Sequence, residues 1–349
     1  MADLRSRLSR FVGAALRGGD RLRLDAVAQR FERRARALAN APAGSRAGDP
    51  SDAIVVQGPT TADTETSLAS LRRLYPREII VLSTWQDTDT ALRARLAGYC
   101  NAVVLSAPPR SPGGSNRNYQ IVSTNAGLAR ARELGALTVI KMRTDTCLMS
   151  PHLFALYRLL EAQYDRGAAQ ANGLAGRIFV PQTYTKKYFP CHVSDIVMLG
   201  HAGDLARYWN VPLDERPLAP EDFSWGRQSL ERIGTEGLLP ECYLGWRFAE
   251  GLGLADRSAP LAAYWRLLRD YFVVVDDAWF DLYWLKRPLH LQPRAVDELV
   301  THHFWQTLYF GLEVPLAAWR ADLDAARTEG ARFDYGSPPN PAGHAGASR

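Results

Sequence analysis

The sequence is poor in cysteine and has no long hydrophobic run. Its four cysteines lie far apart and form no CxxC pair, which argues against a zinc ribbon and a dense disulfide framework. No stretch of about 18 apolar residues occurs, and the start MADLRSRLSRFVGAALRGGD lacks the long apolar centre of a secretory signal. We therefore expect a protein of a reducing compartment, cytoplasmic and either soluble or peripheral to a membrane.

Common nucleotide-binding and nucleophile motifs are also missing. The first apolar strand is followed by neither GxGxxG nor GxxxxGK[ST], which disfavours an NAD-type Rossmann site and a P-loop. No G-x-S-x-G elbow is present. A nucleotide would have to be bound by backbone and side chains of another kind.

Positive charge is concentrated at the amino terminus. Residues 1–50 carry eleven arginines against five acidic residues, whereas the whole chain has a formal charge of +5. The remainder is close to neutral and has no familiar nucleic-acid motif, so we expect no nucleic-acid binding. Apolar residues at helical spacing in residues 1–40 predict two amphipathic helices. Their basic faces can point to solvent or contact a membrane, and both interpretations stay open.

From residue 53 onward, short apolar strands alternate with helices. Strands are predicted at 53–59, 78–85, 101–109 and 136–146, and helices at 64–76, 89–100, 116–135 and 150–165. This alternation with short links predicts an α/β fold with a doubly wound, mostly parallel sheet. A further strand is predicted at 176–184, and a mostly helical, aromatic-rich region at 260–330.

We divide the chain into four parts on this basis. They are a basic helical segment with its linker (1–50), an α/β domain (51–260), a helical carboxyl-terminal extension (261–335) and a disordered tail (336–349).

Polar residues at the carboxyl ends of the predicted strands are candidate ligand contacts, because open parallel sheets bind ligands there. After the first two strands these residues are Gln57, Gly58, Pro59, Thr84 and Trp85.

The start of the helix at 116–135 supplies further candidates. Asn116, Arg117, Asn118 and Gln120 can bind a base, a ribose or a diphosphate through their polar side chains. Helix capping and a solvated face explain these residues equally well.

The strongest strand-end candidates follow the fourth strand. Alternation places Lys141, Arg143 and Asp145 on one side of the chain. A carboxylate there can hold a divalent ion, and an arginine can bind phosphate oxygens in a bidentate manner. An Arg143–Asp145 ion pair that caps the next helix is an equal alternative.

Six motifs occur in a fixed order between residues 53 and 248: AIVVQGPT, IIVLSTW, NRNYQIVSTNAGL, IKMRTDT, VSDIVMLG and PECYLGWRF. Together they resemble the WavE lipopolysaccharide synthesis family. The resemblance implies a role in bacterial lipopolysaccharide or capsular polysaccharide synthesis, and similarity to glycosyltransferases of the GT-A fold, a Rossmann-type fold. In that fold, an acidic motif after the fourth strand holds a metal ion that bridges the nucleotide diphosphate.

The resemblance assigns this metal role to Asp145, with Mn²⁺ or Mg²⁺ as the ion. The sequence RTD departs from the usual D-x-D, because Arg143 stands where the first acid would be. Arg143 can itself neutralise the diphosphate, since a cation at this point stabilises the charge that develops on the leaving group.

We therefore expect a glycosyltransferase that moves a sugar from a nucleotide-sugar donor to a saccharide acceptor. Residues 1–40 would give it peripheral contact with the inner face of the inner membrane. One alternative is a non-catalytic assembly partner of a polysaccharide synthesis complex, which the missing second acid favours. A nucleotidyltransferase is the other, although its usual glycine-rich, lysine-bearing loop does not follow the first strand.

Three later acids are candidates for the general base that deprotonates the acceptor hydroxyl. Asp222 is flanked by aromatic residues that suit a sugar-binding groove, and Asp195 lies in a polar loop before an apolar strand. Glu241 begins an aromatic helix, where it can simply cap the helix through the dipole. We rank Asp222 first, Asp195 second and Glu241 third.

Overall fold

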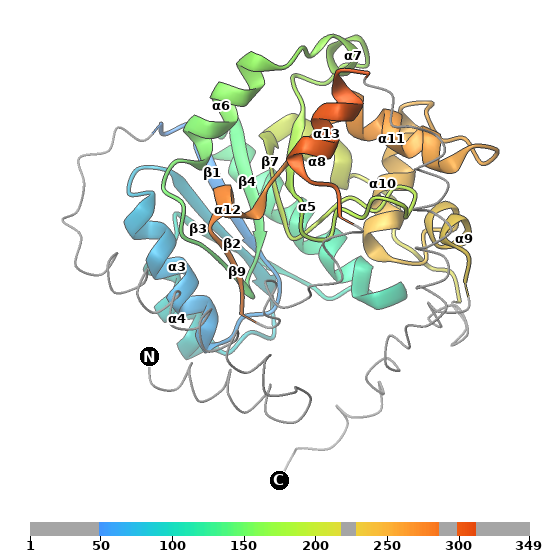
Figure 1. Cartoon of the computed structure of the whole chain (residues 1–349). Coiled ribbons are helices and arrows are strands. Elements are labelled where there is room, and N and C mark those ends of the chain that lie inside the picture. Colours follow the sequence, from blue (N-terminus) through green and yellow to red (C-terminus); the bar gives the residue numbers. More distant parts are fainter. Residues whose placement is uncertain (1–48, 218–227, 286–298, 312–349) are drawn as a thin grey trace, which may run out of the picture.

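The computed structural model describes residues 49–217, 228–285 and 299–311 (Figure 1). The predictions for residues 1–40, for the tail after residue 335 and for Asp222 lie outside the described residues. Within the described part of the chain, no helix is long and apolar enough to cross a membrane.

The centre of the molecule is a seven-stranded sheet in the order β3-β2-β1-β4-β7-β6-β8. The neighbours from β3 to β4 are parallel, β7 is antiparallel to both β4 and β6, and β8 is parallel to β6. The strands are β1 (Asp52–Gln57), β2 (Ile79–Trp85), β3 (Ala102–Ser106), β4 (Thr138–Arg143), β6 (Ile178–Pro181), β7 (Val197–His201) and β8 (Phe272–Val275). The predicted α/β fold with a mostly parallel sheet is confirmed.

Strands β1 and β2 are buried along their whole length. Their near-continuous apolar sequences, DAIVVQ and IIVLSTW, are typical of parallel strands that are covered on both faces. This explains why the sequence pattern located them well.

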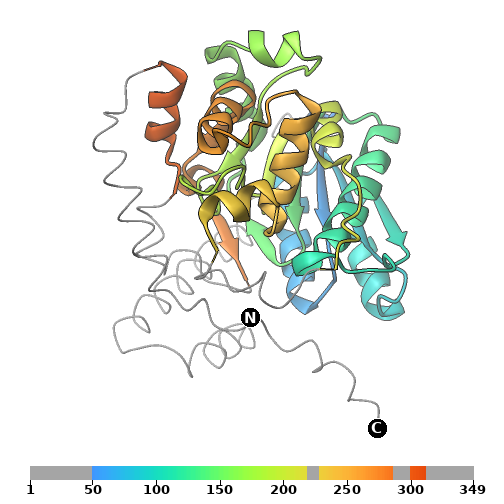
Figure 2. The same ribbon diagram turned by 90° about the vertical axis from the view of Figure 1, so that its right-hand side faces the viewer.

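Helices surround the sheet, with α3 and α4 at the left of Figure 1 and α10, α11 and α13 at the right. Figure 2 shows the same separation from the side, with the red-orange α13 at the left and the blue to teal amino-terminal elements in the right half of the picture. The helices are α3 (Ala62–Leu74), α4 (Thr90–Ala97), α5 (Arg117–Glu133), α6 (Leu153–Gln163), α7 (Gly167–Ala171), α8 (Ala202–Trp209), α9 (Leu230–Thr235), α10 (Pro240–Gly251), α11 (Pro260–Tyr271), α12 (Asp277–Phe280) and α13 (His302–Tyr309), with a short 3₁₀ turn η1 (Gly114–Asn116).

Helix α5 packs closely on the sheet through Gly127. A Cβ at this position would lie 2.5 Å from Cγ1 of Val55 and 3.0 Å from Cβ of Ser83. Glycine therefore lets the helix approach β1 and β2 more closely than any other residue would.

In the described part of the carboxyl-terminal region, helices α11, α12 and α13 alternate with two strands that the sequence pattern did not predict. Residues 272–275 form β8 at the edge of the central sheet, and β9 (Leu282–Trp284) pairs with β5 (Thr146–Leu148) in a second, two-stranded sheet. The reason lies in three consecutive valines after Phe272, which are β-branched and fit a buried strand better than a helix. Strand β8 thus belongs to the central sheet and its core rather than to a separate helical extension.

Candidate functional site

The carboxyl ends of β1 and β4 lie side by side, with Gln57 opposite Arg143. The backbone N–H of Thr144 donates to the carbonyl of Gln57 at 3.0 Å, and its hydroxyl donates to the carbonyl of Pro59 at 2.7 Å. Gly58 has a φ of +125°, and a Cβ there would lie 2.9 Å from the Thr144 hydroxyl oxygen. These contacts join the two strand ends, where Gln57 and Gly58 are buried, Pro59 is exposed, and Oε1 of Gln57 accepts a hydrogen bond of 2.7 Å from Ser123.

Arg143 and Asp145 form a bidentate ion pair on this surface. Nε and Nη2 of Arg143 donate to the two carboxylate oxygens of Asp145 at 2.9 and 2.8 Å. Burial lowers the pKa of Arg143, but the hydrogen bond and charge of Asp145 outweigh it, and the net pKa is raised. Both side chains keep about a quarter of their surface exposed, at 23% and 26%, so a ligand can reach them.

The protein side chains at this point do not by themselves fit a metal ion. Both oxygens of Asp145 accept hydrogen bonds from Arg143. Across residues 49–217, 228–285 and 299–311, no three His, Cys, Asp or Glu side chains are grouped so that they could hold a metal. An ion here would need most of its ligands from phosphate oxygens or water. The metal site at Asp145 stays a prediction, and the chemistry below depends on no metal.

A buried charged cluster lies next to this ion pair. Lys141 is fully buried on β4, its ammonium donates to the backbone carbonyl of Asp195, and its Nζ lies 4.4 Å from the ring centroid of Trp209. Asp195 is 1% exposed and precedes β7, the antiparallel neighbour of β4. Its Oδ2 and the hydroxyl of Ser194 are buried and have no hydrogen-bond partner in the described part of the chain. Such buried polar atoms are rare in native proteins and point to a place that a ligand or water completes.

The ionisation of these groups is strongly coupled. Burial raises the pKa of Asp195, and the charge of Glu241 raises it further, whereas Lys141 and Arg143 lower it. Burial also raises the pKa of Glu241, and it lowers the pKa of Lys141 to about 8. A carboxyl with a raised pKa beside two cations has the properties of a proton acceptor at a functional site.

The charged form of Glu241 is stabilised by the helix on which it lies, unlike that of Asp195. Glu241 lies in the first turn of α10, where its backbone N–H lowers its pKa and the helix dipole favours its charge. His192 lies beside it, with Nε2 4.0 Å from the Glu241 carboxylate and Nδ1 2.8 Å from the carbonyl of Tyr184. Burial lowers the pKa of His192 to about 4, so this imidazole is neutral at pH 7.

Four other predicted donor contacts lie near the ends of β2 and the start of α5. Thr84 is buried, and Trp85 is 7% exposed with its ring against the edge of Tyr119 at 5.0 Å. Asn116 is exposed in a left-handed conformation with a φ of +63°. Oε1 of Gln120 is buried and has no hydrogen-bond partner among the described residues. Donor binding by these residues stays a prediction.

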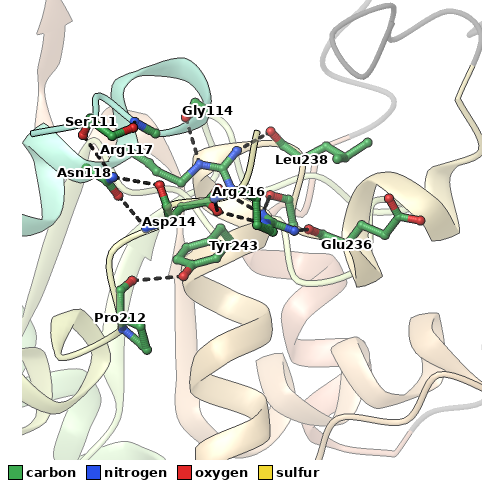
Figure 3. Close-up of polar contacts among 12 residues, drawn as sticks. Ser111, Gly114, Arg117, Asn118, Pro212, Asp214, Arg216, Glu236, Leu238 and Tyr243 are labelled. Carbon is green, nitrogen blue, oxygen red and sulfur yellow. Dashed lines mark hydrogen bonds and ion pairs between the residues drawn. The ribbon is translucent and has the colours of Figure 1, made fainter. Parts of the chain in front are cut away.

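Arg117 and Asn118 have a different environment from the one expected of donor contacts (Figure 3). The buried guanidinium of Arg117 donates to the carbonyls of Gly114 at 2.8 Å and Leu238 at 2.5 Å, and it pairs with Asp214 at 3.1 Å. Asn118 is 1% exposed and exchanges hydrogen bonds of 2.9 and 2.8 Å with the backbone of Asp214. The polar groups of both side chains therefore bind other parts of the protein, and they connect the start of α5 to loops that are distant in the sequence.

One aromatic residue of the site, Trp284, was not predicted from the sequence. Trp284 ends β9, and the guanidinium carbon of Arg143 lies 5.4 Å from its ring centroid. The next residue, Leu285, donates its backbone N–H to the carbonyl of Asp145 at 2.9 Å. Residues 260–330 were expected to be helical, so no sequence signal placed Trp284 here.

Comparisons with known proteins complete the description. No curated protein sequence matches the chain. A solved structure, mouse xyloside xylosyltransferase 1 in its apo form, is similar over 64% of this chain and 83% of its own, with 11% identity and a TM-score of 0.30. The sequence model of the family described as "WavE lipopolysaccharide synthesis" matches residues 52–236, more than half of the 349 residues. The matched region contains Arg143, Asp145 and Asp195, and the chain belongs to the WavE lipopolysaccharide synthesis family.

Proposed function

We propose that this chain is a glycosyltransferase that moves a sugar from a nucleotide-sugar donor to a saccharide acceptor. Membership of a lipopolysaccharide synthesis family supports a role in building that glycan or a related capsular polysaccharide. The observation that carries the proposal is the meeting of Arg143, Asp145 and the buried Asp195 where β4 ends.

In this proposal Arg143 binds the diphosphate of the donor. Its Nε and Nη2 already donate to Asp145, and the remaining N–H groups of the planar guanidinium can donate to phosphate oxygens. Asp145 orients the guanidinium before the donor arrives. When the bond to the sugar breaks, the positive charge of Arg143 stabilises the negative charge that develops on the leaving diphosphate.

Gln57, Gly58 and Pro59 lie beside Arg143 at the end of β1, so we propose that they contact the nucleotide portion of the donor. Thr84, Trp85, Asn116 and Gln120 extend the same edge toward β2 and α5. Asp145 would be the residue to hold a divalent metal ion, which would add positive charge at the same point, and this remains part of the proposal to be tested.

Transfer with inversion needs a base that removes the proton of the acceptor hydroxyl. We propose Asp195 for this role among the described residues. Burial raises the pKa of both Asp195 and Glu241, but of the two only Asp195 has a buried carboxylate oxygen without a hydrogen-bond partner among the described residues, whereas Glu241 lies in the first turn of its own helix. Asp222 lies outside the described residues and remains the competing candidate.

Donor binding provides the first test. Calorimetry should detect binding of at least one of UDP, GDP, CMP and their sugars, with or without Mn²⁺, and Arg143→Met should abolish that binding. Arg158→Met is the matched control, because Arg158 also pairs with aspartates, at 3.3 and 2.7 Å, but at the opposite, amino end of β1. The proposal fails if the wild type binds none of these ligands, or if Arg143→Met binds them as well as Arg158→Met does.

A second function deserves a test because Asp145 is a single carboxylate engaged by Arg143. A non-catalytic assembly partner would keep the fold and lose the chemistry. Asp145→Ala should abolish polysaccharide production if the site is catalytic. Unchanged surface glycan at a normal protein level would instead favour the assembly partner.

A further inference from the structure

An aromatic corner made by Trp284 and Tyr184 stands beside the Arg143–Asp145 ion pair. The two rings meet edge to face, with centroids 5.4 Å apart and planes at 81°. Both side chains are half-buried, and Arg143 lies against the Trp284 ring at 5.4 Å. The corner is therefore next to the proposed diphosphate position and within reach of ligand.

Strand pairing fixes the position of Trp284. β9 runs antiparallel to β5, with Trp284 opposite Thr146, the residue directly after Asp145. The Leu285 N–H to Asp145 carbonyl bond extends this pairing to the site itself. The family match ends at residue 236, so a segment outside it supplies this wall of the site.

Tyr184 is held in an unusual backbone conformation. Its φ is +63°, a left-handed value that is uncommon for a bulky residue and persists only where the surrounding structure enforces it. His192 hydrogen-bonds the Tyr184 carbonyl at 2.8 Å, and the neutral imidazole lies 4.0 Å from Glu241. The conformation that directs the Tyr184 ring to Trp284 is thus coupled to the carboxylate side of the same site.

We propose that Trp284 and Tyr184 form the platform for a pyranose ring at the reaction centre, an inference that rests on the proposed glycosyltransferase function. The C–H groups on one face of a pyranose carry partial positive charge and pack on the negative face of an aromatic ring. The hydroxyl groups at the ring edge then meet charged partners, here Arg143 and Asp145. Oδ2 of Asp195, buried and without a partner among the described residues, supplies a further acceptor beside the cluster.

A sugar fits this corner better than the nucleobase does. The base is joined to the diphosphate through the ribose, and the predicted nucleotide contacts lie along the ends of β1 and β2. The corner instead joins the β4 end through β5, which directly follows the diphosphate residues in the chain, and through β9, which pairs with β5. The ring that adjoins the reacting bond belongs to the donor sugar or to the acceptor, and both present the same chemistry.

Three variants separate the platform from its surroundings. Trp284→Ala removes one ring, and Trp284→Phe restores an aromatic face. Tyr184→Asn removes the other ring while it keeps a residue that tolerates the left-handed conformation. Trp279→Ala is the control, because Trp279 is 44% exposed on α12 in the same chain segment.

The measurement compares free UDP and GDP with UDP-glucose, UDP-N-acetylglucosamine and GDP-mannose by calorimetry, followed by turnover with oligosaccharides released from lipopolysaccharide. If the platform holds the donor sugar, Trp284→Ala and Tyr184→Asn weaken nucleotide-sugar binding roughly tenfold and leave the free nucleotide unchanged. If it holds the acceptor, donor binding is unchanged and the acceptor KM rises roughly tenfold. Either result is expected to be largely rescued in Trp284→Phe and absent in Trp279→Ala.

Two results overturn the platform while the proposed function stands. One is an equal loss of free UDP or GDP binding, which would mean that Trp284 supports Arg143 or stacks on the base. The other is no change in either donor binding or acceptor KM. A wild-type protein that binds none of UDP, GDP, CMP and their sugars overturns the proposed function and the platform together.

Discussion

Replacing Arg117 by Met distinguishes a structural arginine from a donor contact. The Arg117 side chain is fully buried and pairs with Asp214, which is itself 1% exposed on its side chain. Burial lowers the pKa of Arg117 to about 10, with Asp214 opposing this, so the guanidinium is charged at pH 7. Methionine has a similar length but leaves the aspartate and three carbonyls, those of Gly114, Gly237 and Leu238, without this donor.

The loss of stability can be bounded from these contacts. Removing one partner of a buried ion pair costs about 3–5 kcal/mol, because the other charge stays buried. Arg216 still binds Asp214 at 2.7 Å, so we expect the lower limit, about 3 kcal/mol. In a domain of this size 1 kcal/mol shifts Tm by about 2–4 °C, which predicts a fall in Tm of roughly 6–12 °C.

Thermal unfolding and donor calorimetry on the same preparations distinguish a structural role of Arg117 from a role in donor binding. Arg117→Met should melt early yet bind nucleotide at low temperature with an unchanged Kd. Arg216→Met is the control, because Arg216 is 39% exposed and Arg117 would still pair with Asp214, so we expect a smaller loss than in Arg117→Met. An Arg117→Met protein with normal Tm and no nucleotide binding would refute the structural role and restore the donor contact expected from the sequence.

Three further predictions concern pH dependence and packing. Glu161 raises the pKa of His201 through a 2.9 Å hydrogen bond, and the pKa of Glu161 is itself lowered. The pair therefore stabilises the fold fully between pH 4.5 and 6.5, the ordinary pKa values of glutamate and histidine, and this stabilisation is lost as pH rises through the raised pKa of His201. His201→Gln should therefore lower Tm at about pH 5.5 and have little effect at about pH 9, and an equal loss at both would contradict this. Burial raises the pKa of Asp195, so kcat/KM should fall on acidification with an apparent pKa above about 4, and a limb at about 4 would argue for another base. Gly127→Ala should lose about 1–3 kcal/mol of unfolding free energy in urea, because its Cβ would lie 2.5 Å from Val55, and unchanged stability would contradict the close approach of α5.

The sequence located the elements whose signals are local. β1, β2 and β4 are short apolar runs followed by turn residues, and their carboxyl ends carry the polar side chains that alternation assigned to one edge. Arg143 and Asp145 could be identified in this way because parallel strands bring their ends together regardless of the details of packing. Both interpretations of the pair were open, and the structure contains the ion pair, but strand β5 follows it and helix α6 begins only at Leu153, so the pair does not cap a helix.

The contacts that the sequence could not give are those between distant segments. Arg117 binds Leu238, and Asp195 reaches the end of β4 only because β7 runs antiparallel to it. Trp284 depends on the pairing of β9 with β5, and its strand is too short to show a period. The sequence pattern also placed β8 in the mostly helical region, because its valine run directly follows an amphipathic helix and nothing local shows that it pairs with a sheet edge.

The most direct test of the central claim measures donor binding and turnover together in Asp195→Asn. The amide keeps the shape of the side chain and removes its basicity. We expect the variant to bind the nucleotide sugar with the wild-type Kd while release of nucleoside diphosphate in the presence of acceptor falls about 10²- to 10⁴-fold, the usual contribution of a general base. Full turnover in Asp195→Asn would show that the acceptor proton is removed elsewhere and would contradict the assignment of the reaction to the buried cluster at the end of β4.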